Sequence, residues 1–176
     1  MQTATFANGC FWCTEAVFQR LEGVSNIVSG FTGGQIKNPP YREVVQGRTG
    51  HAEAIQLTYD SSKISYEELL MVFFSTHDPT TLNRQGNDVG TQYRSAIFYH
   101  FEDQKQMAQN VINKLNEEIF EGNIVTEVTE ASKFYTAEFE HQNFYNSHPN
   151  QPYCQYIIDP KIKKLKEYFS DKLKFD

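Results

Sequence analysis

The first 31 residues switch twice between strand and helix patterns, and this switching constrains the fold more than any other feature of the chain. Thr3–Ala7 has the β-branched and aromatic residues of a strand, and residues 10–21 follow as a helix that Gly23 stops. Val24–Phe31 is extended again. A strand, a helix and a second strand in this order predict a βαβ unit.

Later segments continue the alternation. Ser65 and Glu68 form a capping box, with Ile64 and Leu69 placed as a hydrophobic staple, so a helix is predicted to run to about Thr76. The other expected elements are strands at 54–59, 95–99 and 124–129, a helix over 107–119 and a final helix after Asp159-Pro160. Two long polar loops, 32–50 and 77–94, are longer than simple connections and suggest function.

These elements predict an α+β fold. We expect a two-layer sandwich with a split βαβ (ferredoxin-like) core, helices mainly on one sheet face, and an irregular, helix-ended C-terminal tail. At 176 residues, one domain spanning 1–176 is long enough to bury a full hydrophobic core.

Composition narrows the classes of partner. The net charge is −6, and no basic run interleaves with aromatic residues, which argues against nucleic-acid binding. The N-terminus lacks the pattern of a signal peptide, and the longest apolar run, 69–74, is far too short to cross a bilayer. A cytoplasmic monomer without membrane contact is therefore expected. The Lys-rich segment 161–174 fits an amphipathic helix with a solvated face.

Cys10 is the expected nucleophile because it lies where the first strand gives way to the first helix. Unpaired N–H groups and the helix dipole favour an anion there, which predicts a lowered thiol pKa. Gly9 permits a sharp reversal of the chain beside the sulfur. The competing interpretation is an inert buried cysteine.

Two further thiols could resolve an oxidised Cys10. Cys13 lies one helical turn away, although it also fits a core position, and Cys154 follows turn-forming residues that could let it swing. A Cys-x-x-Cys pair at a helix start equally fits a general disulfide oxidoreductase. A zinc-binding or methionine-binding module is the alternative outside enzymes, but zinc would need more ligands than the pair offers.

Two loops carry polar groups to the start of predicted strands. The segment GRTGHAE, residues 47–53, delivers Glu53, and GTQYRS, residues 90–95, follows Asp88. Taken singly, these are ordinary loop ends, and composition alone favours an exposed or ion-paired Glu53.

Together the motifs resemble the methionine sulfoxide reductase A family. The resemblance rests on GCFWC at 9–13, a tyrosine in the Pro-rich loop, GRTGHAE at 47–53, HDPTTLNRQGNDVGTQYRS at 77–95 and HQNFYNSHPNQPYC at 141–154. It implies a peptide-methionine (S)-S-oxide reductase that needs no cofactor or metal. The implied substrate is methionine-(S)-sulfoxide, free or in oxidised proteins, with thioredoxin as reductant, in repair after oxidative stress.

The resemblance also implies a role for each matched residue. Cys10 would attack the sulfoxide sulfur while Glu53 protonates the oxygen, which requires a raised carboxyl pKa. The remaining roles are a methyl cage from Phe11 and Trp12, hydrogen bonds to the oxygen from Tyr41 and Tyr93, and support of the site by Asp88 and His51.

The chain departs from the simplest pattern of that family at two positions. Cys13 stands where many members carry glycine, so that both Cys13 and Cys154 are candidates for the resolving thiol, of which Cys154 is favoured. Arg42 stands where an acidic residue is frequent.

Overall fold

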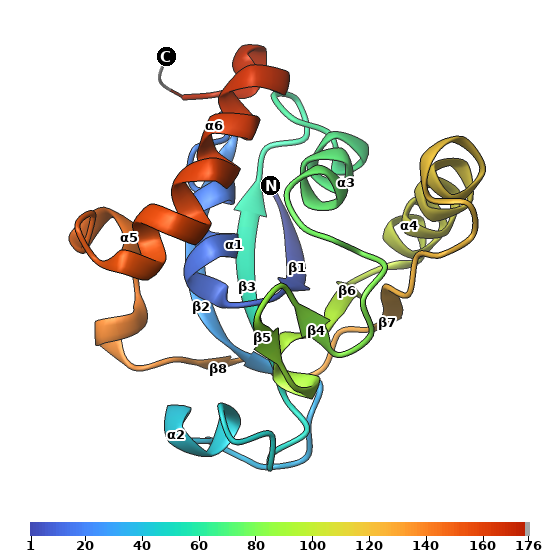
Figure 1. Cartoon of the computed structure of the whole chain (residues 1–176). Helices are drawn as coiled ribbons and strands as arrows, with labels where there is room; N and C mark the ends of the chain where they lie inside the picture. The colour runs from blue at the N-terminus through green and yellow to red at the C-terminus, as the bar shows by residue number, and fades with distance from the viewer. Residues whose placement is uncertain (175–176) are drawn as a thin grey trace.

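A central six-stranded sheet organises the chain, as the computed structural model shows (Figure 1). The structure describes residues 1–174, and residues 175–176 of the expected domain lie outside that range. The strands of this sheet stand in the order β7-β6-β1-β3-β2-β8. Their bounds are β1 Gln2–Asn8, β2 Val24–Thr32, β3 Ala52–Tyr59, β6 Ser95–Tyr99, β7 Glu127–Glu130 and β8 Tyr135–Thr136.

The helices connect these strands. They are α1 Phe11–Phe18, α2 Tyr41–Val44, α3 Tyr66–Ser75, α4 Glu102–Leu115, α5 Phe144–Ser147 and α6 Asp159–Tyr168. Within residues 1–174, none of them combines the length and the apolar character that a membrane span requires. The mixture of strands and helices predicted from the alternating patterns is confirmed.

Strand pairing explains how the first unit folds. β3 pairs antiparallel with both β1 and β2, so these two strands run in the same direction on either side of β3. β6 pairs antiparallel with the other side of β1, and β7 then runs parallel to β6 after α4. The start of α1 and the start of β3 therefore meet at one end of the central strands.

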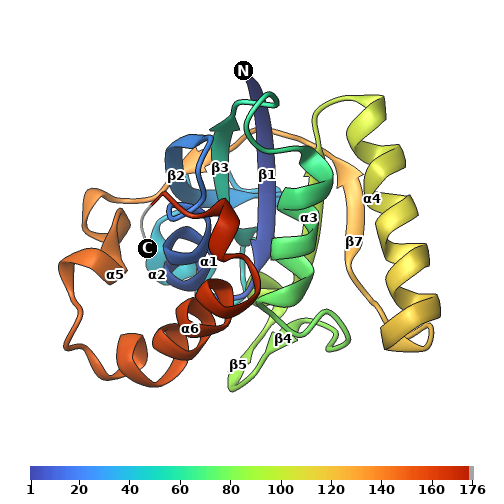
Figure 2. The same ribbon diagram turned by 90° about the horizontal axis from the view of Figure 1, so that it is seen from above.

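The two faces of the sheet are covered differently. Alternate β1 residues face opposite ways: Ala4 and Phe6 belong to the main core with α1 and α3, whereas Ala7 lies in a small second cluster with Phe98 and Phe134. The segment between β7 and β8 joins opposite edges of the sheet, and Figure 2 shows it passing behind β1, β3 and β2. Helices thus occupy one face and an extended segment the other.

Several predicted boundaries shift. The capping box is present, since Glu68 N donates to Ser65 Oγ and Ser65 N donates to the Glu68 carboxylate, each at 3.0 Å. By contrast, α1 ends at Phe18, before the predicted Leu21, and α4 begins at Glu102. The second long loop contains a hairpin that the sequence analysis did not predict, formed by β4 Arg84–Gln85 and β5 Asp88–Val89.

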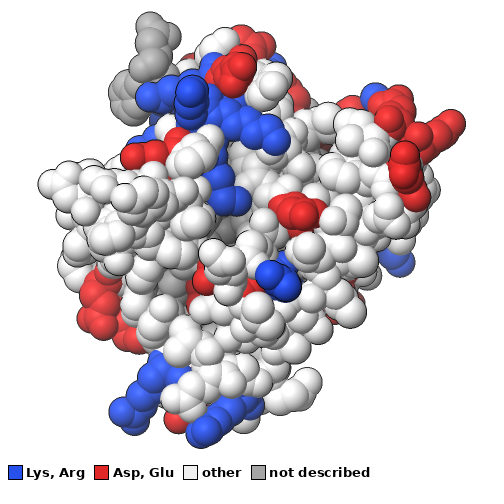
Figure 3. Space-filling view, viewed as in Figure 1, with Lys and Arg blue, Asp and Glu red and all other residues white. Residues whose placement is uncertain are grey.

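The C-terminal segment is more ordered than an irregular tail. A π-helical turn, Cys154–Ile158, runs directly into α6, and Ile162 and Leu165 of α6 are buried against the body. Figure 3 shows cationic side chains gathered over the end of α6. Lys163 and Lys166 of this helix are exposed. The expectation of an amphipathic helix with a solvated face is confirmed.

Candidate active site

Cys10 lies at the turn between β1 and α1. It is the N-cap of α1, and the preceding Gly9 has φ +110°, a backbone conformation that residues other than glycine rarely adopt. A Cβ at Gly9 would stand 2.9 Å from Gln85 Cγ, so the β4–β5 hairpin also requires glycine there. Cys10 is 7 % exposed, and the three cysteines are all reduced.

The pKa of Cys10 is raised in the structure, contrary to the prediction that the helix start would lower it. Burial, a hydrogen bond donated to Cys13 and the neighbouring Glu53 raise the pKa of Cys10 well above its ordinary value. Loss of water around the sulfur outweighs the dipole of an eight-residue helix. The pKa of Cys13 is lowered instead, chiefly because it accepts that hydrogen bond.

Glu53 is a buried carboxyl beside this thiol pair. It lies on β3 with 0 % exposure, and its Oε1 accepts a hydrogen bond of 3.1 Å from the backbone N–H of Phe11. Burial raises the pKa of Glu53 to about 8, and that single N–H opposes the shift only partly. Oε2 has no hydrogen-bond partner within residues 1–174. A neutral carboxylic acid therefore stands next to Cys10 with one oxygen free.

Two phenols from different loops flank the acid. Tyr41 begins α2, and Tyr93 ends a 3₁₀ turn at Thr91–Tyr93. Burial first, and then the charge of Glu53, raises the pKa of both phenols, so both remain hydrogen-bond donors at neutral pH.

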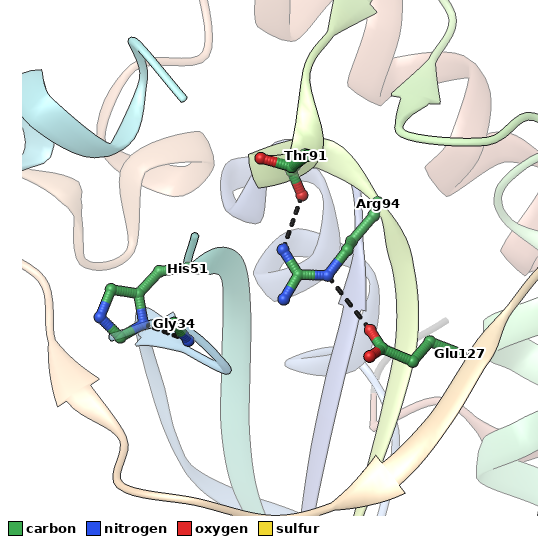
Figure 4. Close-up of polar contacts among 5 residues, drawn as sticks. All are labelled: Gly34, His51, Thr91, Arg94 and Glu127. Carbon is green, nitrogen blue, oxygen red and sulfur yellow. Dashed lines mark hydrogen bonds and ion pairs between the residues drawn. The ribbon is translucent and has the colours of Figure 1, made fainter. Parts of the chain in front are cut away.

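His51 ties these loops together rather than facing the thiols. Its Nδ1 accepts from Gly34 N at 3.0 Å (Figure 4). This leaves Nε2 to donate to the Ile36 carbonyl at 2.6 Å. Both ring nitrogens are thus engaged by the backbone of the loop that precedes α2. The contact with Gly34 anchors this loop to His51, which lies two residues before Glu53 in the chain.

Arg94 holds the loop that carries Tyr93. Its guanidinium donates to the Thr91 carbonyl at 2.9 Å and to Glu127 at 3.2 Å, as Figure 4 shows. A cavity of about 420 Å³ lies beside this pair, lined by loop residues that include Leu82 but no thiol. This cavity therefore belongs to the surroundings of Arg94 and is not part of the thiol site.

An aromatic wall begins at the two residues that follow Cys10 in the chain. Phe11 is fully buried against Tyr41, and the Trp12 indole stacks on Phe144 with ring centroids 3.7 Å apart and planes 7° apart. His141 lies against Tyr41 at 4.1 Å and also approaches Phe11. The wall therefore combines the first helix with the C-terminal segment.

The sequence analysis did not assign His141, Phe144 or Tyr153 to the site. The signal was available, because all three fall in the quoted motif at 141–154, and that motif is rich in aromatic residues. Their partners in α1 are more than 120 positions away in the chain, so no local pattern could pair them.

A hydrogen-bonded chain leads from Asp88 to the thiols. Tyr153 Oη donates to Asp88 Oδ2 at 2.8 Å and lies 3.6 Å from Cys13 Sγ, which in turn interacts with Cys10. These four residues line a cavity of about 350 Å³ together with Lys161. Asp88 thus lies at the thiol cavity and is hydrogen-bonded to Tyr153 there.

Cys154 lies in the core instead of a mobile tail. It has 0 % exposure and opens the π-helical turn before α6. The expectation that flanking turn residues let it swing fails, because Gln151 Oε1 caps its backbone N–H and the helix continues past it. Burial first, and then the neighbouring Cys13, raises the pKa of Cys154.

One group of side chains within residues 1–174 has the spacing of metal ligands. Glu138, Glu140 and His141 offer atoms within 4.8 Å of one another, but both carboxylates are exposed. His141 packs against the aromatic wall, and none of the three cysteines belongs to this group.

The chain matches the family model described as peptide methionine sulfoxide reductase over residues 2–173. It is 55 % identical over 173 residues to peptide methionine sulfoxide reductase MsrA 1 of Rhodopirellula baltica, covering 98 % of this chain and 90 % of the relative. The fold matches methionine sulfoxide reductase A of Corynebacterium diphtheriae with TM-score 0.80 and 36 % identity, covering 85 % of this chain and 76 % of that one.

The fold also matches reduced Mxr1 from Saccharomyces cerevisiae with TM-score 0.79 and 31 % identity, covering 85 % of this chain and 87 % of that one. Mxr1 has been solved in complex with Trx2 as well; that structure has TM-score 0.56 and 24 % identity, covers 81 % of this chain and 84 % of that one, and speaks for the fold alone. On the family model and on full-length identity above one half, the chain belongs to the peptide methionine sulfoxide reductase family.

Proposed function

We propose that this chain reduces methionine-(S)-sulfoxide, free or in oxidised proteins, to methionine. The observation that carries the proposal is a carboxyl with a pKa of about 8 beside a buried thiol, with its Oε2 unpartnered within residues 1–174. A sulfoxide oxygen needs a proton donor as it leaves sulfur, and a neutral carboxylic acid at pH 7 supplies one. The aromatic wall of Phe11 and Trp12 suits the apolar, polarisable CH₃–S group.

In the first step, Cys10 attacks the sulfoxide sulfur. The Cys10 thiol gives its proton to the hydrogen-bonded Cys13 thiolate, and the new thiolate bonds to the substrate sulfur as Glu53 protonates the oxygen. Tyr41 and Tyr93 donate hydrogen bonds to that oxygen. The S–O oxygen ends on Cys10 as a sulfenic acid, methionine leaves, and sulfur on the substrate gains the two electrons that Cys10 loses.

In the second step, another thiol condenses with the sulfenic acid to form a disulfide and water. Cys13 and Cys154 both remain candidates, and the packing favours Cys13 for the first attack because it already interacts with the Cys10 sulfur. Cys154, buried next to Cys13, then serves as a relay that carries the disulfide onward. This order reverses the preference that the sequence motif implies.

We further propose thioredoxin as the reductant of that disulfide; Mxr1, whose reduced form is 31 % identical to this chain, has itself been solved in complex with Trx2. His51 acts by holding its loop, since both ring nitrogens bind backbone atoms. The strand order β6-β1-β3-β2 supports a split βαβ core, in one catalytic domain that works as a monomer. Free thiols and disulfide exchange suit a reducing compartment such as the cytoplasm, where the enzyme repairs oxidative damage.

Stereochemistry tests the main proposal. Incubation with dithiothreitol and racemic methionine sulfoxide should consume the S epimer at sulfur and spare the R epimer. A Glu53→Gln variant should slow the first turnover by roughly 10²–10⁴-fold, the usual contribution of a positioned acid. Equal consumption of both epimers would contradict the proposal. Reduction of insulin disulfides that survives Glu53→Gln would instead favour a general disulfide oxidoreductase.

The resolving thiol is tested by two matched variants. Cys13→Ser and Cys154→Ser are compared in one stoichiometric turnover and in thioredoxin-coupled turnover. Cys13→Ser should trap the sulfenic acid on Cys10, detectable by mass spectrometry after dimedone labelling. Cys154→Ser should form the 10–13 disulfide and accumulate it. The opposite pattern would restore Cys154 as the first resolving thiol.

A further inference from the structure

Lys161 brings a cation to the thiol site from the C-terminal helix. It lies in the first turn of α6 and lines the 350 Å³ cavity together with Cys10, Cys13 and Asp88. The proposed first step gives it no direct role. Its ammonium is the one cationic group among the residues that line this cavity.

The ammonium is held in place by backbone and not by a carboxylate. Nζ donates to the carbonyl of Thr76 at 2.5 Å, and Thr76 is the C-cap of α3. The negative end of a helix dipole tolerates a cation at that position. Among residues 1–174, no Asp or Glu oxygen lies within 4.0 Å of this ammonium. Its charge is therefore not neutralised by a salt bridge.

The remaining groups around Cys13 are neutral or negative. Cys10 donates a hydrogen bond to it, the Tyr153 hydroxyl lies 3.6 Å away, and Asp88 acts through that hydroxyl. Glu53 and Cys154 interact with Cys13 from β3 and from the turn before α6. Lys161 is thus the one cation among the groups within residues 1–174 that interact with Cys13 and line its cavity.

We propose that Lys161 is a positioning residue that keeps Cys13 as a thiolate for attack on the Cys10 sulfenic acid. The inference rests on the proposed function and assigns a residue to its second step. In that step Cys13 releases the proton that it took from Cys10, its sulfur gives an electron pair to the Cys10 sulfur, the S–O bond breaks, and the hydroxide leaves as water with that proton. A nearby positive charge lowers the free energy of the attacking anion before the step.

The magnitude follows from charge proximity. Removing one cation from the surroundings of a thiolate should raise the pKa of Cys13 by about one pH unit, at the low end of the range for a neighbouring charge. The thiolate fraction below that pKa then falls about tenfold. A more basic thiolate is also more nucleophilic, so resolution should slow by only about threefold.

Lys161→Met removes the charge and keeps most of the stem, Lys161→Arg restores the charge, and Lys164→Met is the matched control one turn along α6. Each protein is labelled with iodoacetamide from pH 5 to pH 10, and tandem mass spectrometry reads the label on each cysteine. In Lys161→Met, the Cys13 profile should move up by about one pH unit, and Lys161→Arg and Lys164→Met should follow the parent protein.

Kinetics separate this inference from the function on which it rests. Because the Cys13 thiolate also takes the Cys10 proton in the first step, the single stoichiometric turnover of methionine sulfoxide should slow at most about tenfold in Lys161→Met, and the separately measured conversion of sulfenic acid to disulfide should slow about threefold. An unchanged Cys13 profile in a folded Lys161→Met protein would overturn the role of Lys161 while leaving the reductase activity intact. Loss of the single turnover in the parent protein would instead count against the proposed function. If Lys161→Met fails to fold, Lys161→Gln, which keeps a donor for the Thr76 carbonyl, makes the same comparison.

Discussion

Replacing Glu53 by Gln should stabilise the fold more and more as the pH rises from about 5 to about 8. In the folded chain, burial raises the pKa of Glu53 from its ordinary 4.5 to about 8. Between these values the folded state retains a proton that the unfolded state has released, so the parent protein loses stability as pH rises through this window. Gln is neutral at every pH, and its carbonyl can still accept from Phe11 N.

The size of the effect follows from the two pKa values. Each pH unit inside the window costs the parent protein about 1.4 kcal/mol relative to the variant. At pH 7 the accumulated difference is roughly 3 kcal/mol, and at pH 8 it approaches about 5 kcal/mol. These are upper figures, since relaxation of the site reduces them, but they are a large share of a typical stability of about 5–15 kcal/mol.

Urea denaturation under reducing conditions measures this difference. The free energy of unfolding of the parent and of Glu53→Gln is determined at pH 5, 6, 7 and 8. Glu118→Gln, at an exposed position after α4, removes the same formal charge and should differ from the parent equally at each pH. A Glu53→Gln difference that stays constant from pH 5 to pH 8 would refute the inference that burial keeps this carboxyl protonated.

Three further changes test other parts of the structure. Ser65→Ala removes the capping box of α3 and should lower the free energy of unfolding by about 1 kcal/mol in urea denaturation, with the reductase turnover unchanged. Gly34→Ala would place a Cβ 2.4 Å from His51 N, so it should cost about 1–3 kcal/mol of stability and lower the first turnover by displacing the loop before Glu53; unaltered kinetics would contradict this reading of the loop. Tyr153→Phe removes the hydrogen bond to Asp88 and the contact with Cys13, so thioredoxin-coupled turnover should slow by several-fold; a rate equal to the parent's would exclude Tyr153 from the regeneration step.

Part of the site could be predicted from the chain because its determinants are local. A turn that needs φ +110° selects Gly9, and the capping box of α3 is formed by two residues three positions apart. The position of Glu53 at the start of a strand follows from the alternation of the residues after it. The chemical roles of these residues came from the motif resemblance, because the spacing of apolar residues carries no information on chemical roles.

The protonation states could not be predicted in this way. Phe11 and Glu53 are 42 positions apart, and Cys13 and Tyr153 are 140 positions apart. A helix start by itself predicts a lowered pKa for Cys10, yet the core that closes over the sulfur reverses the direction. The cost of removing water depends on what packs around a group, which is a property of the whole fold.

The sequence by itself therefore indicated the mixture of strands and helices, and it placed Cys10 at the first helix start and Glu53 at the start of a strand, because each of these depends on residues a few positions apart. Only the tertiary structure decided that the pKa of Cys10 is raised while that of Cys13 is lowered, that Cys154 is buried, and that His141, Phe144 and Lys161 return from the end of the chain to the first helix and the thiol cavity. Those outcomes depend on desolvation and charge between segments that meet only when the sheet and its helices are assembled.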